Sequence, residues 1–457
     1  MPSKIENPFG TTALPEEWAA LKKFEKDDSI RRVIVLPSFK IKNTSFSKNF
    51  MVKRCDDVVI EAESVHPAYF EYQIGCGFLV VKFDIDYHDG IMSILKKALS
   101  RGIAELPKIW FPVLKKIIQH LSSRHKIVDA KLIESIPPGN WLKSISSGTR
   151  GYLLEKGDPY NFLPYMDRFT KGTVDTSNRI NELTSILSAT WLNGWLAKPD
   201  DNAFLTLTGS HYLDIHFVRE VSDYMHSSLT GKLILHIHGG GENIPMMLNE
   251  NSMRAAKNGE FEESVLFDLI DLMNNLATTN RVALAMRFIR HLRNIMGDFS
   301  TEPIIDQPHH DVFASKKAVF YYNDSQRLKK GQIAILPSGY PLADSYLVKP
   351  GNRAKEILHG LSHNLKIPAK NGETIPSGKG NVLLVETYGM SDRWQLLSRK
   401  ISMDILEKEH HISFGAQKII ERMFRENFLR PVATLQPLLR FHNRRRELPF
   451  QKIGIPK

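Results

Sequence analysis

Two apolar segments with the residue pattern of β-strands place glycines and potential metal ligands at their ends. Residues 75–87 (GCGFLVVKFDIDY) begin with glycines and continue as an alternating strand, so Cys76 lies at a strand start where backbones approach closely. Residues 232–238 form a strongly β-like run that ends in three glycines, and such a loop suits close approach of a ligand to the backbone. These segments predict two β-strands, each with a glycine-rich loop at one end.

Helical periodicity surrounds the predicted strands, so we expect the α+β class. Further strands are expected at residues 32–41, 58–63, 204–218 and 332–336, and helices at 14–26, 91–101, 108–124, 178–197, 263–295 with a break near Thr278, and 400–428. No Gly/Ser-rich or Pro-rich linker divides the 457 residues. We therefore expect a single domain, 1–457, with residues 1–30 as a peripheral N-terminal extension.

The composition is typical of a globular protein that binds a polyanion. Hydrophobic residues make up 42% and charged residues 24% of the chain, which is enough to bury a core. The 61 basic and 50 acidic residues give a net charge of +11, which favours a partner such as RNA. The two cysteines cannot form a disulfide framework, and no apolar run suggests a signal core or a membrane span. A cytoplasmic protein that does not enter the membrane is expected.

Residues 204–218 read as a strand, a tight Thr-Gly-Ser turn and a second strand. Alternation places Tyr212, Asp214 and His216 on one face of the second strand, while His211 lies at the turn. Either histidine could be a ligand by residue type, and His216 is expected to be a surface histidine.

Other candidate ligands come in ambiguous pairs. His236 and His238 point the same way along their strand, so either could bind a metal. His309 and His310 in the polar loop 306–311 are similarly interchangeable. Taken alone, Cys76 would be interpreted as a small buried hydrophobic residue.

Residues 333–365 combine a turn with an isolated His-Gly pair. The turn at residues 337–339 follows a strand-like run and could direct N–H groups and hydroxyls at phosphate oxygens. His359 then lies at a helix end, next to Gly360. A neutral imidazole there could act as a nucleophile toward phosphorus, although a helix C-cap is the commoner meaning of the pattern.

Arg287, Arg290 and Arg293 lie three residues apart in the longest predicted helix. They could follow a phosphate backbone, or they could form an ordinary exposed face.

Several of these stretches resemble, in the same order, motifs of the RtcB-type RNA ligases. YQIGCGF (72–78) resembles Asp-(Ile/Val)-Gly-Cys-Gly-Met, LTGSHYLD (207–214) resembles Gly-Gly-Gly-Asn-His-Phe-x-Glu, and LHIHGGG (235–241) resembles His-x-Gly-Ser-Arg-Gly. DQPHHD (306–311) stands where the family has a metal-binding His. PSGYPLADSYLV (337–348) is similar to Pro-Gly-Ser-x-Gly-x-x-Ser-Tyr-Leu-Val, LHGLSH (358–363) to His-Gly-Ala-Gly-Arg, and VATLQPLLRFHN (432–443) to the closing Val-Ala-x-Leu-x-Pro-Leu segment.

The resemblance implies an RtcB-like single domain, in which a β-sheet core with surrounding helices holds a central metal and nucleotide cleft. The implied activity is joining of RNA 3'-phosphate or 2',3'-cyclic phosphate ends to 5'-hydroxyl ends, with GTP and Mn²⁺. The implied catalytic residue is His359, which would carry GMP. The implied metal ligands are Cys76, His211, His236 and His309, and the implied nucleotide-binding residues are Ser338, Gly339, Ser345, Tyr346, Lys349, Gly360 and His442.

The chain departs from the family pattern at functional positions. Gln73 stands in place of a metal-binding Asp, and His363 in place of Arg, while Ser210, Gly240 and His310 replace Asn, Arg and Asn. Loss of the carboxylate should weaken manganese binding and favour zinc. Two alternatives therefore remain open, a catalytically degenerate RNA-binding protein and a metal-dependent phosphoesterase acting on RNA ends.

Overall fold

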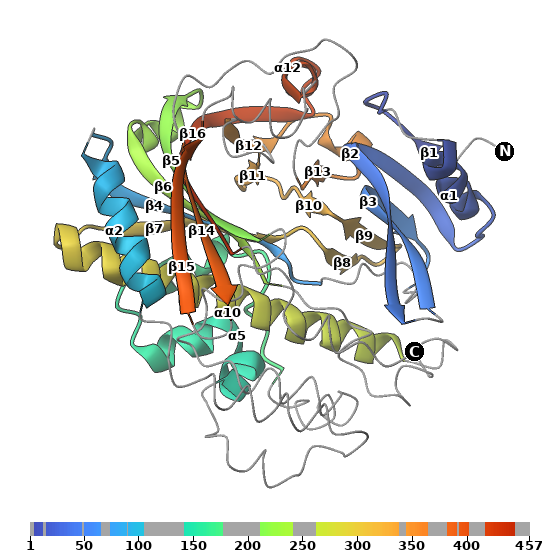
Figure 1. The fold of residues 1–457 in the computed structure, drawn as a ribbon. Coiled ribbons are helices and arrows are strands. Elements are labelled where there is room, and N and C mark those ends of the chain that lie inside the picture. Colours follow the sequence, from blue (N-terminus) through green and yellow to red (C-terminus); the bar gives the residue numbers. More distant parts are fainter. Residues whose placement is uncertain are drawn as a thin grey trace, which may run out of the picture.

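A large, mostly antiparallel sheet dominates the computed structural model, which describes residues 4–11, 15–47, 50–64, 74–88, 90–104, 141–176, 211–240, 262–337, 344–363, 382–390, 393–401 and 416–443 (Figure 1). Its strands run in the order β11 (Ala334–Leu336), β12 (Ser345–Pro350), β16 (Leu429–Asn443), β5 (Tyr212–Val221), β6 (Lys232–Gly239), β4 (Gly77–Asp86) and β7 (Thr301–Pro308). β14 (Val382–Met390) pairs in parallel with β16 and carries β15 (Arg393–Ile401).

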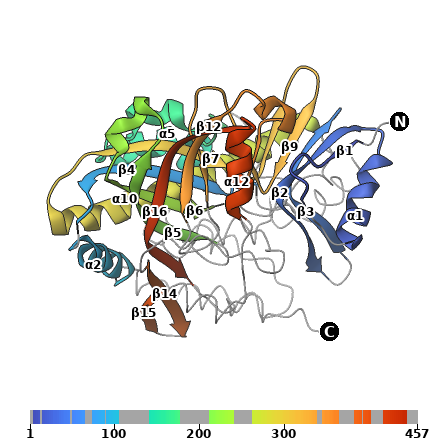
Figure 2. The ribbon, with the colours of Figure 1, turned by 90° about the horizontal axis from the view of Figure 1, so that it is seen from above.

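Two smaller sheets accompany it. The five-stranded sheet has the order β1 (Ile5–Glu6), β2 (Ile30–Ser47), β3 (Phe50–Ala62), β9 (Val319–Asn323) and β8 (Asp311–Ala314), and β10 (Ser325–Arg327) pairs with β13 (Gly360–Ser362). Helix α1 (Pro15–Glu25) packs on the five-stranded sheet, with Leu21 fully buried. Figure 2 shows α1 at one end of the molecule and α2 (Ile91–Ala104) at the other.

The remaining described helices are α5 (Trp141–Lys156), α10 (Glu263–Met296), α12 (Ala416–Arg425) and the 3-10 helices η2 (Leu163–Arg168), η5 (Tyr224–Leu229) and η6 (Ala354–Ile357). None of the helices in the described ranges combines the length and apolarity needed to span a bilayer.

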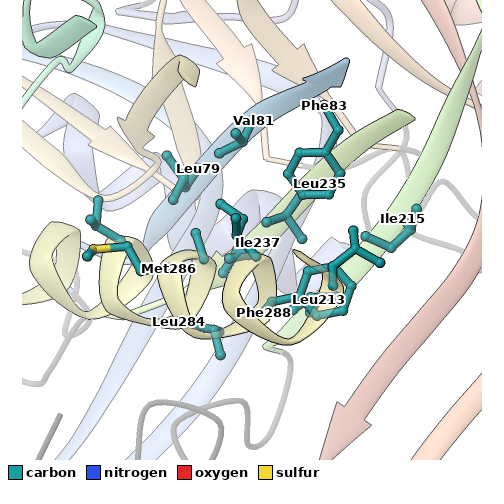
Figure 3. Packing of buried hydrophobic residues seen from close by; sticks show 14 of the residues in the cluster. Leu79, Val81, Phe83, Leu213, Ile215, Leu235, Ile237, Leu284, Met286 and Phe288 are labelled. Carbon is teal, nitrogen blue, oxygen red and sulfur yellow. The ribbon is translucent and has the colours of Figure 1, made fainter. Parts of the chain in front are cut away.

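Helix α10 packs against both the large sheet and the five-stranded sheet. Its C-terminal half, including Leu284, Met286 and Phe288, packs on one face of the large sheet (Figure 3), while Leu269 and Met273 belong to the core of the five-stranded sheet. The expected break near Thr278 is wrong, because the helix is continuous. The polar residues that suggested a break are buried instead at the junction between the two cores.

Strand alternation decides where the functional residues can lie. In β4, β5 and β6, alternate residues such as Leu79, Leu213 and Ile237 face α10 (Figure 3). The intervening residues, among them Phe78, Tyr212 and His238, therefore lie on the opposite face of the sheet.

The α+β class is confirmed, and so are most strands and helices predicted within the described residues. Within the predicted helix 400–428, Lys400 and Ile401 instead end strand β15 and residues 416–425 form α12, while residues 402–415 lie outside the described residues. The helices expected at 108–124 and 178–197 lie outside the described residues.

Candidate metal centre

Cys76, His211, His238 and His309 come together where β4, β5, β6 and β7 end. The Sγ atom of Cys76 lies 3.2 Å from Nε2 of His211 and 3.5 Å from Nε2 of His238. Nε2 of His238 lies 2.9 Å from Nε2 of His309. A thiol and three imidazoles whose donor atoms face one another are a suitable ligand set for a transition metal such as zinc.

The carboxylate of Asp324 lies beside this cluster and close to three histidine rings. One oxygen of Asp324, Oδ1, lies 3.2 Å from Nδ1 of His309, 3.1 Å from Nε2 of His310 and 3.3 Å from Nδ1 of His363. In metal sites, a carboxylate on the second ring nitrogen of a ligating histidine fixes its tautomer and orientation. His309 has this arrangement, with Nε2 toward Cys76 and His238 and Nδ1 toward Asp324.

The pKa values of His238 and Asp324 are shifted in the directions that favour binding of a cation. Burial, together with the neighbouring His363 and His309, holds the pKa of His238 well below its usual value, so the imidazole is neutral and can donate its lone pair. Burial opposes ionisation of Asp324, but His363 and His310 outweigh it and hold the pKa of Asp324 well below its usual range. The centre therefore contains the neutral imidazole of His238 and the ionised carboxylate of Asp324.

Arg281 of α10 ties the ligand-bearing segments together. Its guanidinium donates to the carbonyl oxygens of Gly75 and Gly239, both at 2.7 Å, which flank Cys76 and His238. It also forms a bidentate pair with Asp306 of β7 at 2.7 and 2.6 Å. Arg281 and Asp306 are essentially fully buried, so each depends on the other for compensation.

Two glycines allow this close packing. Gly75 and Gly240 have φ of +84° and +87°, and a Cβ atom on either would lie 2.9 or 2.7 Å from Cβ of Ala277. The strand ends can reach α10 only because these positions lack side chains and Ala277 has a short one. This is a direct reason for glycines beside Cys76 and after His238.

The predicted ligands are only partly the ones that the structure brings together. Cys76, His211 and His309 meet as expected from the resemblance, but the partner supplied by β6 is His238 and not His236. His236 lies instead in a second group with Asp214 and His216. The expectation that His216 is a surface histidine is wrong, because it is 1% exposed.

His359 does not join the centre. It follows η6 and the left-handed Leu358, has a positive φ of 56° itself, and is exposed. Strand β13 separates it from His363, and at about 3.3 Å per residue the two Cα atoms are roughly 13 Å apart. The histidine next to the centre is His363, whose ring centroid lies 4.1 Å from that of His309.

The fully described members of the expected nucleotide-binding set lie on strands β12 and β13. Ser345, Tyr346 and Lys349 lie on β12, where Lys349 is paired with Asp223 at 2.9 Å, and Gly360 begins β13. Burial raises the pKa of Tyr346 to about 12. Ser338 and Gly339 lie outside the described residues, and His442 lies in β16 with a side chain that is likewise not described.

The arginines of α10 do not form a common face for phosphates. Arg287 is buried, and Arg293 donates to the carbonyl of Phe299 at 2.7 Å beside the helix end. Only Arg290 of the three is exposed.

Asp324 and Arg281 were not predicted as parts of the site, and His363 was noted only as a departure from the family pattern and not as a neighbour of the metal ligands. A weak signal for Asp324 exists, because an Asn-Asp-Ser sequence between two β-like runs is typical of a tight turn, and Asp324 has φ of +49°. Arg281 gave no signal, since a charged residue in a helix is usually exposed.

Comparison with protein-family models and with curated proteins gives no match for this chain.

Proposed function

We propose that the chain is a GTP- and divalent-metal-dependent ligase that joins RNA 3'-phosphate or 2',3'-cyclic phosphate ends to 5'-hydroxyl ends. The observation that carries the proposal is the meeting of Cys76, His211 and His309, three residues chosen from the order of motifs in the sequence, around a common centre. The net charge of +11 supports a nucleic-acid substrate.

A divalent ion held by these residues would neutralise phosphate charge and orient the reacting oxygens. In the proposed reaction a histidine nitrogen bonds to the α-phosphorus of GTP, the bond to the bridging oxygen breaks, and pyrophosphate leaves. Water first opens a 2',3'-cyclic phosphate end to the 3'-phosphate. An oxygen of the 3'-phosphate then bonds to the phosphorus of GMP as the bond to the histidine nitrogen breaks. The 5'-hydroxyl oxygen finally bonds to the RNA phosphorus and GMP leaves, which closes the 3'–5' bond. These steps require a neutral histidine near the metal centre.

Two histidines can take the nucleophilic role. The motif resemblance favours His359, whose pKa is lowered by partial burial of the ring and by nearby Arg327, which favours the neutral form. Proximity to the centre favours His363, which lies beside His309 and Asp324. The proposal requires one of them to carry the nucleotide.

The test is incubation with α-labelled GTP and manganese or zinc, followed by denaturing electrophoresis, for the original protein and the variants His359→Ala and His363→Ala. A labelled band that one variant lacks would identify the nucleophile. His88→Ala, which alters an exposed histidine outside the proposed site, is the matched control and should retain the label. No label with either metal in the folded protein would contradict the ligase proposal.

A metal-dependent phosphoesterase acting on RNA ends is the second candidate. It is favoured by the separation of His359 from the centre and by the pairing of Lys349 with Asp223, since this chemistry needs the metal centre but no nucleotide. Opening of a 2',3'-cyclic phosphate without GTP, lost in Cys76→Ser, would support it over ligation.

A further inference from the structure

A second group of ligand-type side chains lies deeper on the same face of the large sheet. Asp214 and His216 of β5 and His236 of β6 are 1%, 1% and 0% exposed, and one donor atom from each lies within 4.8 Å of the others. Asp214 is the direct cross-strand partner of His236, two residues along from the pairing of Tyr212 with His238.

The two histidines of this group have orphaned nitrogens. Neither Nδ1 nor Nε2 of His216 or His236 has a hydrogen-bond partner within the described part of the chain. Oδ2 of Asp214 lies 3.7 Å from Nε2 of His216, which is beyond hydrogen-bond distance. Buried polar atoms left unsatisfied cost free energy, so a pair of such imidazoles facing one carboxylate calls for a specific explanation.

We propose that Asp214, His216 and His236 form a second metal site, closed from solvent and suited to zinc or a similar divalent transition ion. Two ligands of a tetrahedral zinc ion, each about 2.0–2.2 Å from the metal, lie roughly 3.4 Å apart. The separation of 3.7 Å between Asp214 and His216 is close to that spacing. Two imidazoles and a carboxylate also form a common zinc ligand set.

Arg440 of β16 pairs with the carboxylate of Asp214 and leaves that carboxylate able to bind a metal. It donates from Nε to Oδ1 of Asp214 at 2.7 Å and from a terminal nitrogen to Oδ2 at 2.5 Å. A carboxylate accepts at about four lone-pair positions, so a bidentate arginine leaves room for one metal bond. Its positive charge lowers the affinity for a cation, so this site should fill after the centre at Cys76.

The two sites are distinct. The Phe78 ring packs against both histidines of β6, with centroids 5.2 Å from His236 and 4.9 Å from His238, and Tyr212 likewise contacts both. The first site contains a thiol and the second does not. A metal probe that reports sulfur ligation therefore separates them.

The first experiment is titration of the metal-free protein with Co²⁺, followed by absorption spectroscopy and metal analysis. The original protein should bind one ion with thiolate-to-cobalt charge transfer and a further ion with ligand-field bands only. His236→Leu should bind one ion fewer and keep the charge-transfer band, whereas Cys76→Ala should lose that band and keep the second ion. His226→Leu is the matched control. Equal stoichiometry in His236→Leu and the original protein would overturn the proposal.

A second measurement separates metal binding from simple burial. In chelator, His236→Leu should be at least as stable as the original protein, because two orphaned nitrogens are removed. Added Zn²⁺ should raise the unfolding midpoint of the original protein further than that of His236→Leu, and His216→Leu should behave like His236→Leu. Equal stabilisation of all three proteins by Zn²⁺ would mean that the histidines are only buried polar residues.

Discussion

One carboxylate oxygen of Asp324 contacts three histidines, so the orientation of these rings is expected to depend on Asp324. Oδ1 lies within 3.3 Å of a ring nitrogen of His309, His310 and His363. The backbone N–H of Asp324 also donates to Nδ1 of His310 at 3.1 Å, which leaves Nε2 of that ring to carry its proton toward the carboxylate. The left-handed backbone of Asp324, with φ of +49°, makes both contacts possible.

Asp324→Asn should weaken metal binding at the Cys76 centre by about 10–100-fold, the usual effect of losing a carboxylate behind a ligating histidine. Asparagine tolerates the left-handed backbone, so the fold should be retained. Competition with a chromophoric chelator measures the affinity. The exposed Asp298→Asn is the control, and an unchanged affinity in Asp324→Asn would mean that the carboxylate does not orient the ligands.

Arg281→Met should lower the free energy of unfolding by roughly 3–5 kcal/mol, because it leaves the buried Asp306 carboxylate uncompensated. It should also weaken metal binding, since Arg281 donates to the carbonyl oxygens of Gly75 and Gly239, the residues next to Cys76 and His238. Chemical denaturation measures the first effect and chelator competition the second. Arg290→Met, at an exposed position of the same helix, should change stability by less than about 0.5 kcal/mol.

If the charge of Asp306 is the cause, the double variant Arg281→Met with Asp306→Leu should be more stable than Arg281→Met alone. No recovery in the double variant would show that packing, and not the lost ion pair, accounts for the loss.

At the scale of elements, α10 is the common support of the whole arrangement. It packs on both sheets, and its middle turn presents Ala277 to Gly75 and Gly240 and Arg281 to the strand-end carbonyls. Thr278 adds a hydrogen bond to Asp306 at 3.0 Å. The polar middle of the helix is thus the part that contacts the ligand-bearing strands.

Ala277→Val should destabilise the protein by roughly 1–3 kcal/mol and reduce metal occupancy, because the added methyl groups have no space between Gly75 and Gly240. Thermal unfolding and metal analysis check the two effects. Asn294→Val, an exposed position near the end of the same helix, controls for the β-branched side chain and should be nearly neutral. Full metal occupancy in Ala277→Val would show that this contact does not position the ligands.

At the scale of the whole molecule, buried histidines with lowered pKa values lie together on one face of the large sheet. The free energy of unfolding is therefore expected to fall as the pH decreases. Burial lowers the pKa of His216 to about 4 and those of His236 and His238 well below their ordinary value of 6.5. As the pH falls below 6.5, the unfolded chain binds protons at these residues and the folded chain does not. Stability is therefore lost between pH 6.5 and about 4.

In chelator, the free energy of unfolding should fall by roughly 3 kcal/mol for His216 alone between these pH values, at about 1.4 kcal/mol for each unit of pKa shift. Urea unfolding at several pH values measures the loss, and His216→Leu should show a shallower dependence. Because a metal binds only the deprotonated imidazoles, Zn²⁺ should preserve stability down to a lower pH. Equal slopes for His216→Leu and the original protein would contradict this assignment.

The sequence by itself indicated the class of fold and most of the described strands, because alternation, helical periodicity and glycine are local signals. Cys76, His211 and His309 were selected through the order of motifs that resemble the RtcB-type ligases, and not through local pattern alone. The sequence did not distinguish His236 from His238, since both point to the same face of β6. The two differ only in which residue of β5 each lies opposite, Asp214 for His236 and Tyr212 for His238.

The tertiary structure decided everything that depends on distance along the sheet or through the core. It placed Asp324 behind His309, put His363 and not His359 beside the centre, and buried Arg281 under strand ends far from it in sequence. It also brought Asp214 and His216 to His236 in a second group. These choices follow from strand register and helix packing, which long-range contacts fix and no short stretch of sequence encodes.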